Sequence, residues 1–423
     1  MMFKKFLKAY SKKVLHYTLR FLKWSTISII TGLIVGGIST LFSFCMNCAT
    51  EYREEYDYML YLLPLAGIVT VFLYSVFKYK NDKGTNLVLS TIHAKDEIPF
   101  RMAPLIFFTT ILTHLFGGSA GREGAALQLG GSLGNQLGRW FKLDDADKRV
   151  VVLCGMSSAF SAVFGTPMAA AVFSMEVVSV GVMYYSALLP CIFSSLIASY
   201  FSSFFGLKEA AFDQLAFPSL NFLNAAEVIF LSAVCAVLSI AFIVFMHFTG
   251  DVFRKYLKNP YIRIFLAGSA IVLLSLLFQT RDYNGAGISV IAKAINDGEA
   301  VPYAFILKML FTAITIEAGY RGGEIVPSFF IGATFGCTFG SIVGFSPSVC
   351  AVIGLIAMFC GVTNCPITSL LISVELFGSD GIYFYLIAIA VSYFLSGYYG
   401  LYKDQIIVYS KYKTKFLNRK THQ

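Results

Sequence analysis

Two glycine-flanked glutamates are the residues best placed to do chemistry in this apolar chain. Glu123 lies in the stretch "GREG" and Glu324 in the stretch "RGGEIVP". Glycine lets the backbone approach a ligand closely, and the first N–H groups of a helix have no partner within the helix. Because the helix dipole adds positive potential at the same end, each stretch predicts an anion site built from backbone N–H groups.

A carboxylate at such a helix start is itself an anion that fits the site. Charged Glu123 can occupy the anion position and protonated Glu123 can leave it, which would couple proton binding to anion binding. An ionisable residue inside a membrane segment is by default a functional candidate. The alternatives are simple helix capping or pairing with Arg122, although adjacent helix residues do not face each other. Glu324 follows the same logic, with an ion pair to Arg321 as its alternative.

The composition places both motifs in a polytopic membrane protein. Of the 423 residues, 57% are hydrophobic and 13% are charged, whereas a soluble domain carries about 25% charged residues. A membrane-spanning helix needs roughly 20 apolar residues. The apolar segments that serve as the centres of spans are 24–44, 59–77, 103–115, 184–204, 228–247, 264–278 and 382–396.

The remaining apolar sequence, over 117–180 and 301–376, is interrupted by Gly, Pro, Ser and Thr. Such short runs predict broken or half-spanning helices, which persist in lipid only when they are buried in protein. Broken helices at corresponding positions of two halves are typical of secondary transporters, whose substrate site lies where the halves meet.

The two interrupted regions are related by an internal repeat. The segment "SAFSAVFGTPMAAAVFSMEV" (158–177) aligns without a gap on "AMFCGVTNCPITSLLISVEL" (357–376). A glycine-flanked glutamate precedes each segment. We therefore predict an all-α fold with two inverted-topology repeats of tilted and broken helices, over 24–210 and 225–402.

Scarce residues coincide in that alignment. Pro167 meets Pro366 at the start of an apolar helix, and Glu176 meets Glu375 at its end. The two glutamates are expected near the membrane surface or at a subunit contact. Pairing with arginine or with backbone groups is the structural role expected for them.

Basic residues crowd both ends of the chain, with seven Lys and Arg in residues 1–23 and six in residues 403–423. Nucleic-acid binding would explain such tails, but the positive-inside rule explains them more simply because both flank membrane segments. We expect both ends in the cytoplasm, an even number of crossings, and a basic amphipathic helix over 1–23 lying on the membrane. Nucleic acid is not expected as a partner.

Taken together, the motifs resemble the CLC family of chloride channels and proton-coupled anion transporters. "GREGAALQLGGSLG" is similar to the family's Gly-Arg-Glu-Gly-Pro element, with Ala125 in place of the proline. "GGEIVPSFFIGA" is similar to its Gly-Gly-Ile-Phe-Ala-Pro element, and "GLYKDQI" to the segment with the pore tyrosine, here Tyr402. The resemblance covers residues 25–410 and implies a homodimer with one pore per subunit.

Three departures from the chloride-type pattern are informative. Thr85, followed by Asn86, stands where chloride members carry an anion-coordinating serine. Glu324 replaces an apolar residue, and Val177 replaces the internal proton-transfer glutamate of proton-coupled chloride members. Together these changes resemble the fluoride-exporting branch, the F⁻/H⁺ antiporters of bacterial plasma membranes, whose substrates are fluoride and the proton.

The resemblance implies a role for each site residue. Glu123 would be the gate and proton carrier, and Glu324 a second proton stop or swinging gate. Tyr402 would close the inner side of the path through its hydroxyl. The anion-binding groups would come from Thr85, Asn86, Arg122, Gly124, Ile325 and Tyr402, largely as backbone N–H groups and hydroxyls.

Two other classes of function are alternatives to fluoride export. A chloride channel or Cl⁻/H⁺ exchanger of the same fold is the alternative that Thr85, Glu324 and Val177 disfavour. A scaffold or an enzyme is disfavoured because the sequence offers no nucleophile–base motif, metal cluster or nucleotide loop, so neither metal nor cofactor is expected. The nine cysteines form no paired CxxC pattern and are expected to serve in packing, and His114 is expected to be an interhelical residue.

Overall fold

The chain folds into a helical bundle whose elements repeat in order. This computed structural model describes residues 2–79, 84–93, 98–207, 212 and 215–421, and the side chains of residues 2–9, with several of the expected basic residues, lie outside the description. The elements of the first half are α1 (Met2–Glu55), η1 (Asp57–Leu62), α2 (Leu63–Val76), α3 (Thr85–His93), α4 (Met102–Leu115), α5 (Glu123–Trp140), α6 (Asp145–Phe164), α7 (Pro167–Glu176), β1 (Ser179–Val180), η2 (Tyr185–Ala187) and α8 (Leu188–Phe204).

The second half repeats the succession of short helices and ends in two strands. Its elements are α9 (Phe222–Tyr256), α10 (Pro260–Leu277), α11 (Ile288–Asn296), α12 (Ala304–Ala318), α13 (Ile325–Val343), α14 (Pro347–Thr363), α15 (Pro366–Phe377), α16 (Ile382–Leu395), β2 (Ile406–Tyr409) and β3 (Phe416–Lys420). Helices α4 to α7 thus correspond to α12 to α15, as the internal repeat predicts.

Glycine contacts repeat as well. A Cβ atom on Gly130 would lie 2.2 Å from the carbonyl oxygen of Gly155, and one on Gly332 would lie 2.3 Å from that of Gly354. These contacts bring α5 against α6 and α13 against α14 at backbone distance, the small-residue packing that joins helices within lipid. The matched helix pairs confirm the two-repeat architecture.

The two Pro-started helices cap each other. Both carboxylate oxygens of Glu375, at the end of α15, accept hydrogen bonds from Met168 N and Ala169 N at the start of α7, each at 2.8 Å. In return, Glu176 accepts from Ile367 N at 3.1 Å and from Thr368 N at 2.8 Å. Both glutamates therefore pair with backbone groups, as one of the sequence interpretations had it.

Six helices of the described chain are long and apolar enough to cross a membrane. Helices α4 and α16, expected as spans, are shorter, whereas α13 qualifies although its sequence predicts interrupted runs. Two features reconcile α13 with its sequence: Pro327 lies in the first turn, where its missing N–H costs nothing, and its glycines face α14. The spans are embedded among shorter helices, as the sequence predicts for the bundle.

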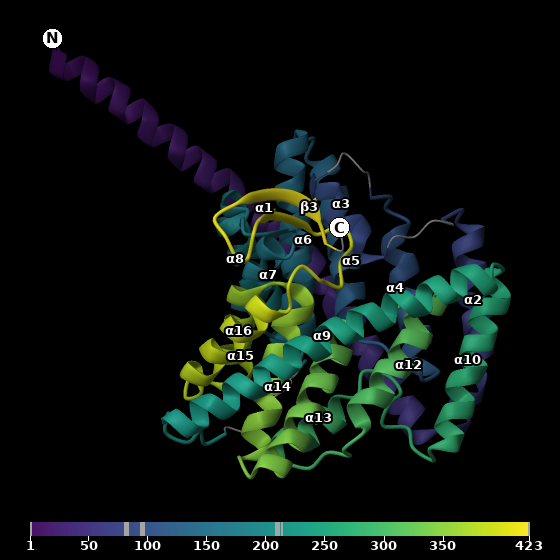
Figure 1. Ribbon diagram of the computed structural model, residues 1–423. Coiled ribbons are helices and arrows are strands. Elements are labelled where there is room, and N and C mark those ends of the chain that lie inside the picture. Colours follow the sequence, from purple (N-terminus) through teal and green to yellow (C-terminus); the bar gives the residue numbers. More distant parts are fainter. Residues whose placement is uncertain (1, 80–83, 94–97, 208–211, 213–214, 422–423) are drawn as a thin grey trace.

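Helix α1 runs unbroken from Met2 to Glu55. From Met2 onward, the stretch expected over 1–23 as a surface helix is therefore continuous with the first span, and it leaves the bundle at the upper left of Figure 1. Its contact with a membrane surface remains a prediction.

The C-terminal segment forms a small sheet that the all-α prediction did not include. Strand β2 pairs antiparallel with β3 and parallel with β1. The Gln405 side chain donates hydrogen bonds to Val177 O and Thr363 O, both at 2.9 Å. The expected tail is therefore docked over the ends of α7 and α14.

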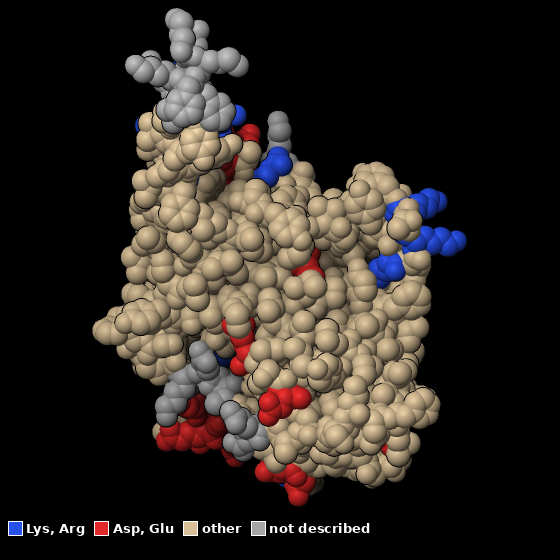
Figure 2. Space-filling model, turned by 90° about the vertical axis from the view of Figure 1, so that its left-hand side faces the viewer, with Lys and Arg blue, Asp and Glu red and all other residues tan. Residues whose placement is uncertain are grey.

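Charge is distributed unequally along the bundle. The N-terminal helix and the C-terminal sheet lie at the same, upper end of the molecule (Figure 1). On the face in Figure 2, most Lys and Arg gather toward this end and most Asp and Glu toward the opposite end, and uncharged residues cover most of the surface between them. This mostly uncharged middle surface has the character of a lipid-facing surface.

Candidate functional site

The loops before α5 and α13 meet at two glycines. Gly121 and Gly323 exchange two backbone hydrogen bonds of 2.7 Å, forming an isolated antiparallel bridge. A Cβ atom on Gly323 would lie 2.5 Å from the backbone nitrogen of Gly124, so the approach requires glycine. The bridge holds the starts of two helices from opposite repeats side by side, as the two glycine-flanked motifs predict.

Glu123 spans the junction between the two helix starts. Its side chain is 1% exposed, and its Oε2 accepts a hydrogen bond from Val326 N, in the first turn of α13, at 3.4 Å. Arg122 points elsewhere, because its Nη1 donates to Asn47 Oδ1 at 3.1 Å. The carboxylate thus occupies the end of the opposite helix, where an anion would be stabilised.

Two polar cavities approach this junction. The first, of about 440 Å³, is lined by Asn47, His114 and Arg122 among others, and we call it the Arg122 cavity. The second, of about 450 Å³, is lined by Thr85, Asn86, Glu317, Glu324 and Tyr402 among others, and we call it the Glu324 cavity. Glu123 lines neither of these two cavities, whereas its neighbour Arg122 lines the first and Glu324, at the opposite helix start, lines the second.

Two neighbouring residues of α3 hold the wall of the Glu324 cavity. The Thr85 hydroxyl donates to Gly124 O at 3.4 Å, and Asn86 Oδ1 accepts from Asp404 N at 3.1 Å. The first bond ties α3 to the start of α5, and the second ties it to the segment that follows Tyr402.

Gln128, which the sequence did not single out, lies behind Thr85 and is bonded to it. Its Nε2 donates to the Thr85 hydroxyl at 3.3 Å, and its Oε1 has no hydrogen-bond partner among the described residues. The signal was present in the sequence, because Gln128 is the one polar side chain in "GAALQLGG".

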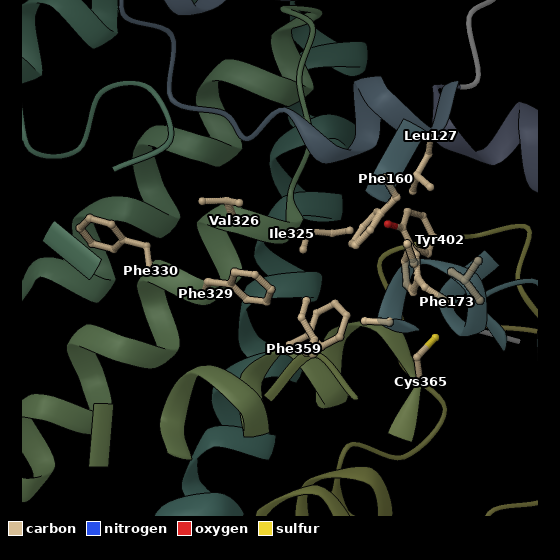
Figure 3. Packing of buried hydrophobic residues seen from close by; sticks show 14 of the residues in the cluster. Leu127, Phe160, Phe173, Ile325, Val326, Phe329, Phe330, Phe359, Cys365 and Tyr402 are labelled. Atoms are coloured by element: carbon tan, nitrogen blue, oxygen red, sulfur yellow. The ribbon is translucent and has the colours of Figure 1, made fainter. Parts of the chain in front are cut away.

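Tyr402 brings a buried donor to the site. Its ring is 2% exposed and packs with Phe160, Phe173 and Ile325, and Figure 3 shows its hydroxyl directed toward the side of Ile325. Within the described chain that hydroxyl has no hydrogen-bond partner. An unsatisfied buried donor lowers the free energy of unfolding by about 1–3 kcal/mol. A ligand that accepts a hydrogen bond from this hydroxyl would offset that loss.

The remaining candidates, His114 and Ile325, are buried among packed helices. The His114 ring, buried between helices, places Nε2 3.3 Å from Gly121 O, next to the glycine bridge. Ile325, which begins α13, is fully buried. In the described part of the chain no three His, Cys, Asp or Glu side chains are grouped as a metal site.

The paired helix starts, the two repeats and the sequence agree with a known family. A profile described as "Voltage gated chloride channel" matches residues 66–397. The chain belongs to the CLC family. A CLC relative, the "Chloride/fluoride channel protein" of Pseudomonas syringae pv. tomato, is 32% identical over 397 residues, which cover 92% of this chain and 88% of that protein.

Solved CLC structures agree with the fold. The crystal structure of a CLC-type fluoride/proton antiporter matches with a TM-score of 0.87 at 29% identity, covering 91% of this chain and 98% of that one. Among relatives compared by sequence, the H(+)/Cl(-) exchange transporter ClcA of Vibrio cholerae is more distant, at 23% identity over 382 residues, which cover 83% of this chain and 81% of that protein. The names of these three CLC proteins describe a channel, an antiporter and an exchange transporter.

Proposed function

We propose that this CLC protein exports fluoride in exchange for protons and so confers fluoride resistance. The observation that carries the proposal is the hydrogen bond from Val326 N to Glu123 Oε2 at 3.4 Å. It supports the proposal because a titratable carboxylate at the start of α13 would compete with a transported anion for the same backbone N–H groups. The fluoride-related names of two relatives support the choice of anion.

Protonation would release the gate. A neutral carboxyl group is held less strongly by a helix start than a carboxylate, because the dipole favours negative charge. A small cavity of about 40 Å³ is lined by Glu123 and Arg122 and otherwise by apolar residues such as Phe164 and Phe329. A neutral side chain fits such apolar surroundings better than a charged one, so the anion position opens when Glu123 takes up a proton.

Fluoride is small and strongly hydrated, and it accepts hydrogen bonds strongly, so its release from water requires compact donors. We assign this role to the first N–H groups of α5 and α13, at Arg122, Glu123, Gly124, Glu324 and Ile325, together with the Tyr402 hydroxyl. The Thr85 hydroxyl and the Asn86 oxygen are bonded to backbone groups. Those two residues act by holding the helix start and the tyrosine segment in place.

Glu324 supplies the second proton stop. It is the N-cap residue of α13 and lines the Glu324 cavity, from which water can reach it. At the position of the internal proton-transfer glutamate the chain has Val177, which is buried and cannot titrate. A proton from Glu123 therefore leaves through Glu324 in the proposed cycle.

Orientation follows from charge. We place the Glu324 cavity, the sheet and both termini on the cytoplasmic side of a bacterial plasma membrane, because Lys and Arg gather at that end (Figure 2) and cytoplasmic segments carry the excess of basic residues. We also propose a homodimer, by resemblance to the CLC family, with one pore per subunit because both helix starts of the site come from one chain.

The test is transport by the purified protein in liposomes. Fluoride release is followed with an electrode and proton uptake with a trapped dye, and chloride is supplied as competitor. A fluoride gradient is expected to drive protons uphill in the opposite direction, and chloride is expected to move far more slowly. Equal chloride flux would favour the chloride exchanger, and fluoride flux without proton movement would favour a channel.

A further inference from the structure

Besides Glu324, two carboxylates line the Glu324 cavity: Asp404, which is paired with Lys420, and Glu317, which the proposed cycle does not use. Glu317 lies in the last turn of α12, and its side chain is 18% exposed. It lines the same space of about 450 Å³ as Glu324 and Tyr402. Since a water molecule takes about 30 Å³ of liquid volume, the cavity can hold a connected chain of water between the two carboxylates.

The fold makes room for this carboxylate at Gly250 of α9. A Cβ atom on Gly250 would lie 2.0 Å from Glu317 Oε2, so any side chain at that position would displace the group. Glycine in a helix interior costs about 1 kcal/mol relative to alanine. Because Gly250 has no side chain, the Glu317 carboxylate can lie at the cavity wall.

Glu317 is paired only loosely. Its Oε2 lies 3.8 Å from Arg254 Nη1, whereas Arg254 Nη2 forms a tighter bond of 2.8 Å with Asp251. The Arg254 side chain is 53% exposed. A carboxylate held this loosely by a solvated partner remains free to exchange protons with water.

The charges around Glu317 favour its ionised form. Arg254 and Asp251 face it from α9, Arg263 from α10 and Lys403 from the segment after Tyr402. His247 of α9 lines the same cavity. Burial is the largest influence on Glu317 and opposes its ionisation, and the three cations partly offset that effect, so the side chain can both hold and release a proton.

We infer that Glu317 is the proton-exchange residue between Glu324 and the open end of the cavity, an inference that rests on the proposed antiport. The proton leaves the carboxyl oxygen of Glu324, passes along cavity water and binds a carboxylate oxygen of Glu317. Glu324 is then charged and Glu317 neutral. Glu317 next gives the proton to water at the cavity mouth and recovers its charge, so the step consumes nothing.

The experiment measures fluoride and proton fluxes together in liposomes that contain the wild type, Glu317→Gln or Glu317→Asp. Glu317→Gln is expected to keep fluoride flux while the protons moved per fluoride fall by about tenfold or more. Glu317→Asp, which keeps a carboxylate, is expected to retain most of the coupling. Glu299→Gln is the matched control, because Glu299 is an exposed partner of Lys293 elsewhere on the surface.

The outcomes separate this inference from the proposed function. A wild type that moves fluoride without protons contradicts the antiport itself. A coupled wild type together with a fully coupled Glu317→Gln overturns the inference and leaves the antiport standing, and so does an equal fall of both fluxes. Gly250→Ala is a second variant, expected to reduce the protons moved per fluoride while Glu317 itself is retained; unchanged coupling in that variant also counts against Glu317.

Discussion

The carboxylate of Glu123, which begins a helix in the first repeat, accepts its hydrogen bond from Val326, in the first turn of a helix in the second repeat, at 3.4 Å. The two residues are 203 positions apart in the chain. The gate of one half is therefore held by the helix end of the other, so releasing it exposes a site to which both halves contribute.

Replacing Glu123 by glutamine tests this relationship. The amide keeps the size of the side chain but cannot titrate, so proton transport is expected to fall by about tenfold or more while fluoride still moves down its gradient. The measurement is the ratio of proton to fluoride flux in liposomes. Glu54→Gln is the control, since Glu54 lines the Arg122 cavity with 64% of its side chain exposed. Coupling that survived in Glu123→Gln would remove Glu123 from the proton path.

Replacing Tyr402 by phenylalanine separates stability from transport. The hydroxyl has no partner in the described chain, so its removal is expected to leave thermal stability unchanged or raised, since a desolvation penalty of about 1–3 kcal/mol disappears. Fluoride flux is expected to fall, because a donor to the anion is lost.

A matched control for that variant is Tyr320→Phe. The Tyr320 hydroxyl lies 2.9 Å from Leu63 O and 3.1 Å from Ile264 O, so this change is expected to destabilise the protein by about 1 kcal/mol. Melting curves and fluoride flux are compared for both variants. A marked loss of stability in Tyr402→Phe would show that its hydroxyl serves the fold.

Replacing Glu176 or Glu375 by glutamine weakens the contact between α7 and α15. Each carboxylate accepts backbone N–H bonds at the opposite helix start, and an amide would place an N–H₂ group near those donors. We expect a loss of about 1–3 kcal/mol for each variant, larger for Glu176, which is 6% exposed. Thermal melting in detergent measures the loss. Destabilisation should come without a change in the ratio of protons to fluoride, and a changed ratio would assign these residues to the proton path.

The burial of Lys411 is expected to make the stability of the protein depend on pH. Its Nζ donates to Asn364 Oδ1 at 2.5 Å and to Tyr393 O at 3.1 Å, and burial lowers the pKa of Lys411 from 10.5 to about 8. Between these two values the unfolded chain holds a proton that the folded chain has lost. The free energy of unfolding therefore rises with pH across that window.

The check for Lys411 is the difference in melting temperature between the wild type and Lys411→Met, measured at several pH values. That difference is expected to shift in favour of the wild type as pH rises above about 8. Lys413→Met, in the same loop, provides the control. A difference that stays flat, or that shifts toward the variant, would contradict the assignment.

Local sequence was sufficient to predict much of the fold and of the candidate site of this protein. Glycine, a glutamate and a following apolar run define each helix start, because the unpaired N–H groups and the dipole are properties of a single turn. The repeat was visible because Pro and Glu are scarce in the chain and coincide in the alignment. These local signals determined the family, the repeat architecture and the two glutamates of the candidate site.

The tertiary structure alone decided which groups meet. No local pattern shows that Glu123 reaches Val326, that Glu176 and Glu375 cap each other's helices, or that Glu317 shares a cavity with Glu324. The C-terminal sheet was missed for the same reason, because its strands are short and β1 lies more than 200 residues from β2. Such contacts depend on how the two halves dock, and docking is set by packing summed over many residues.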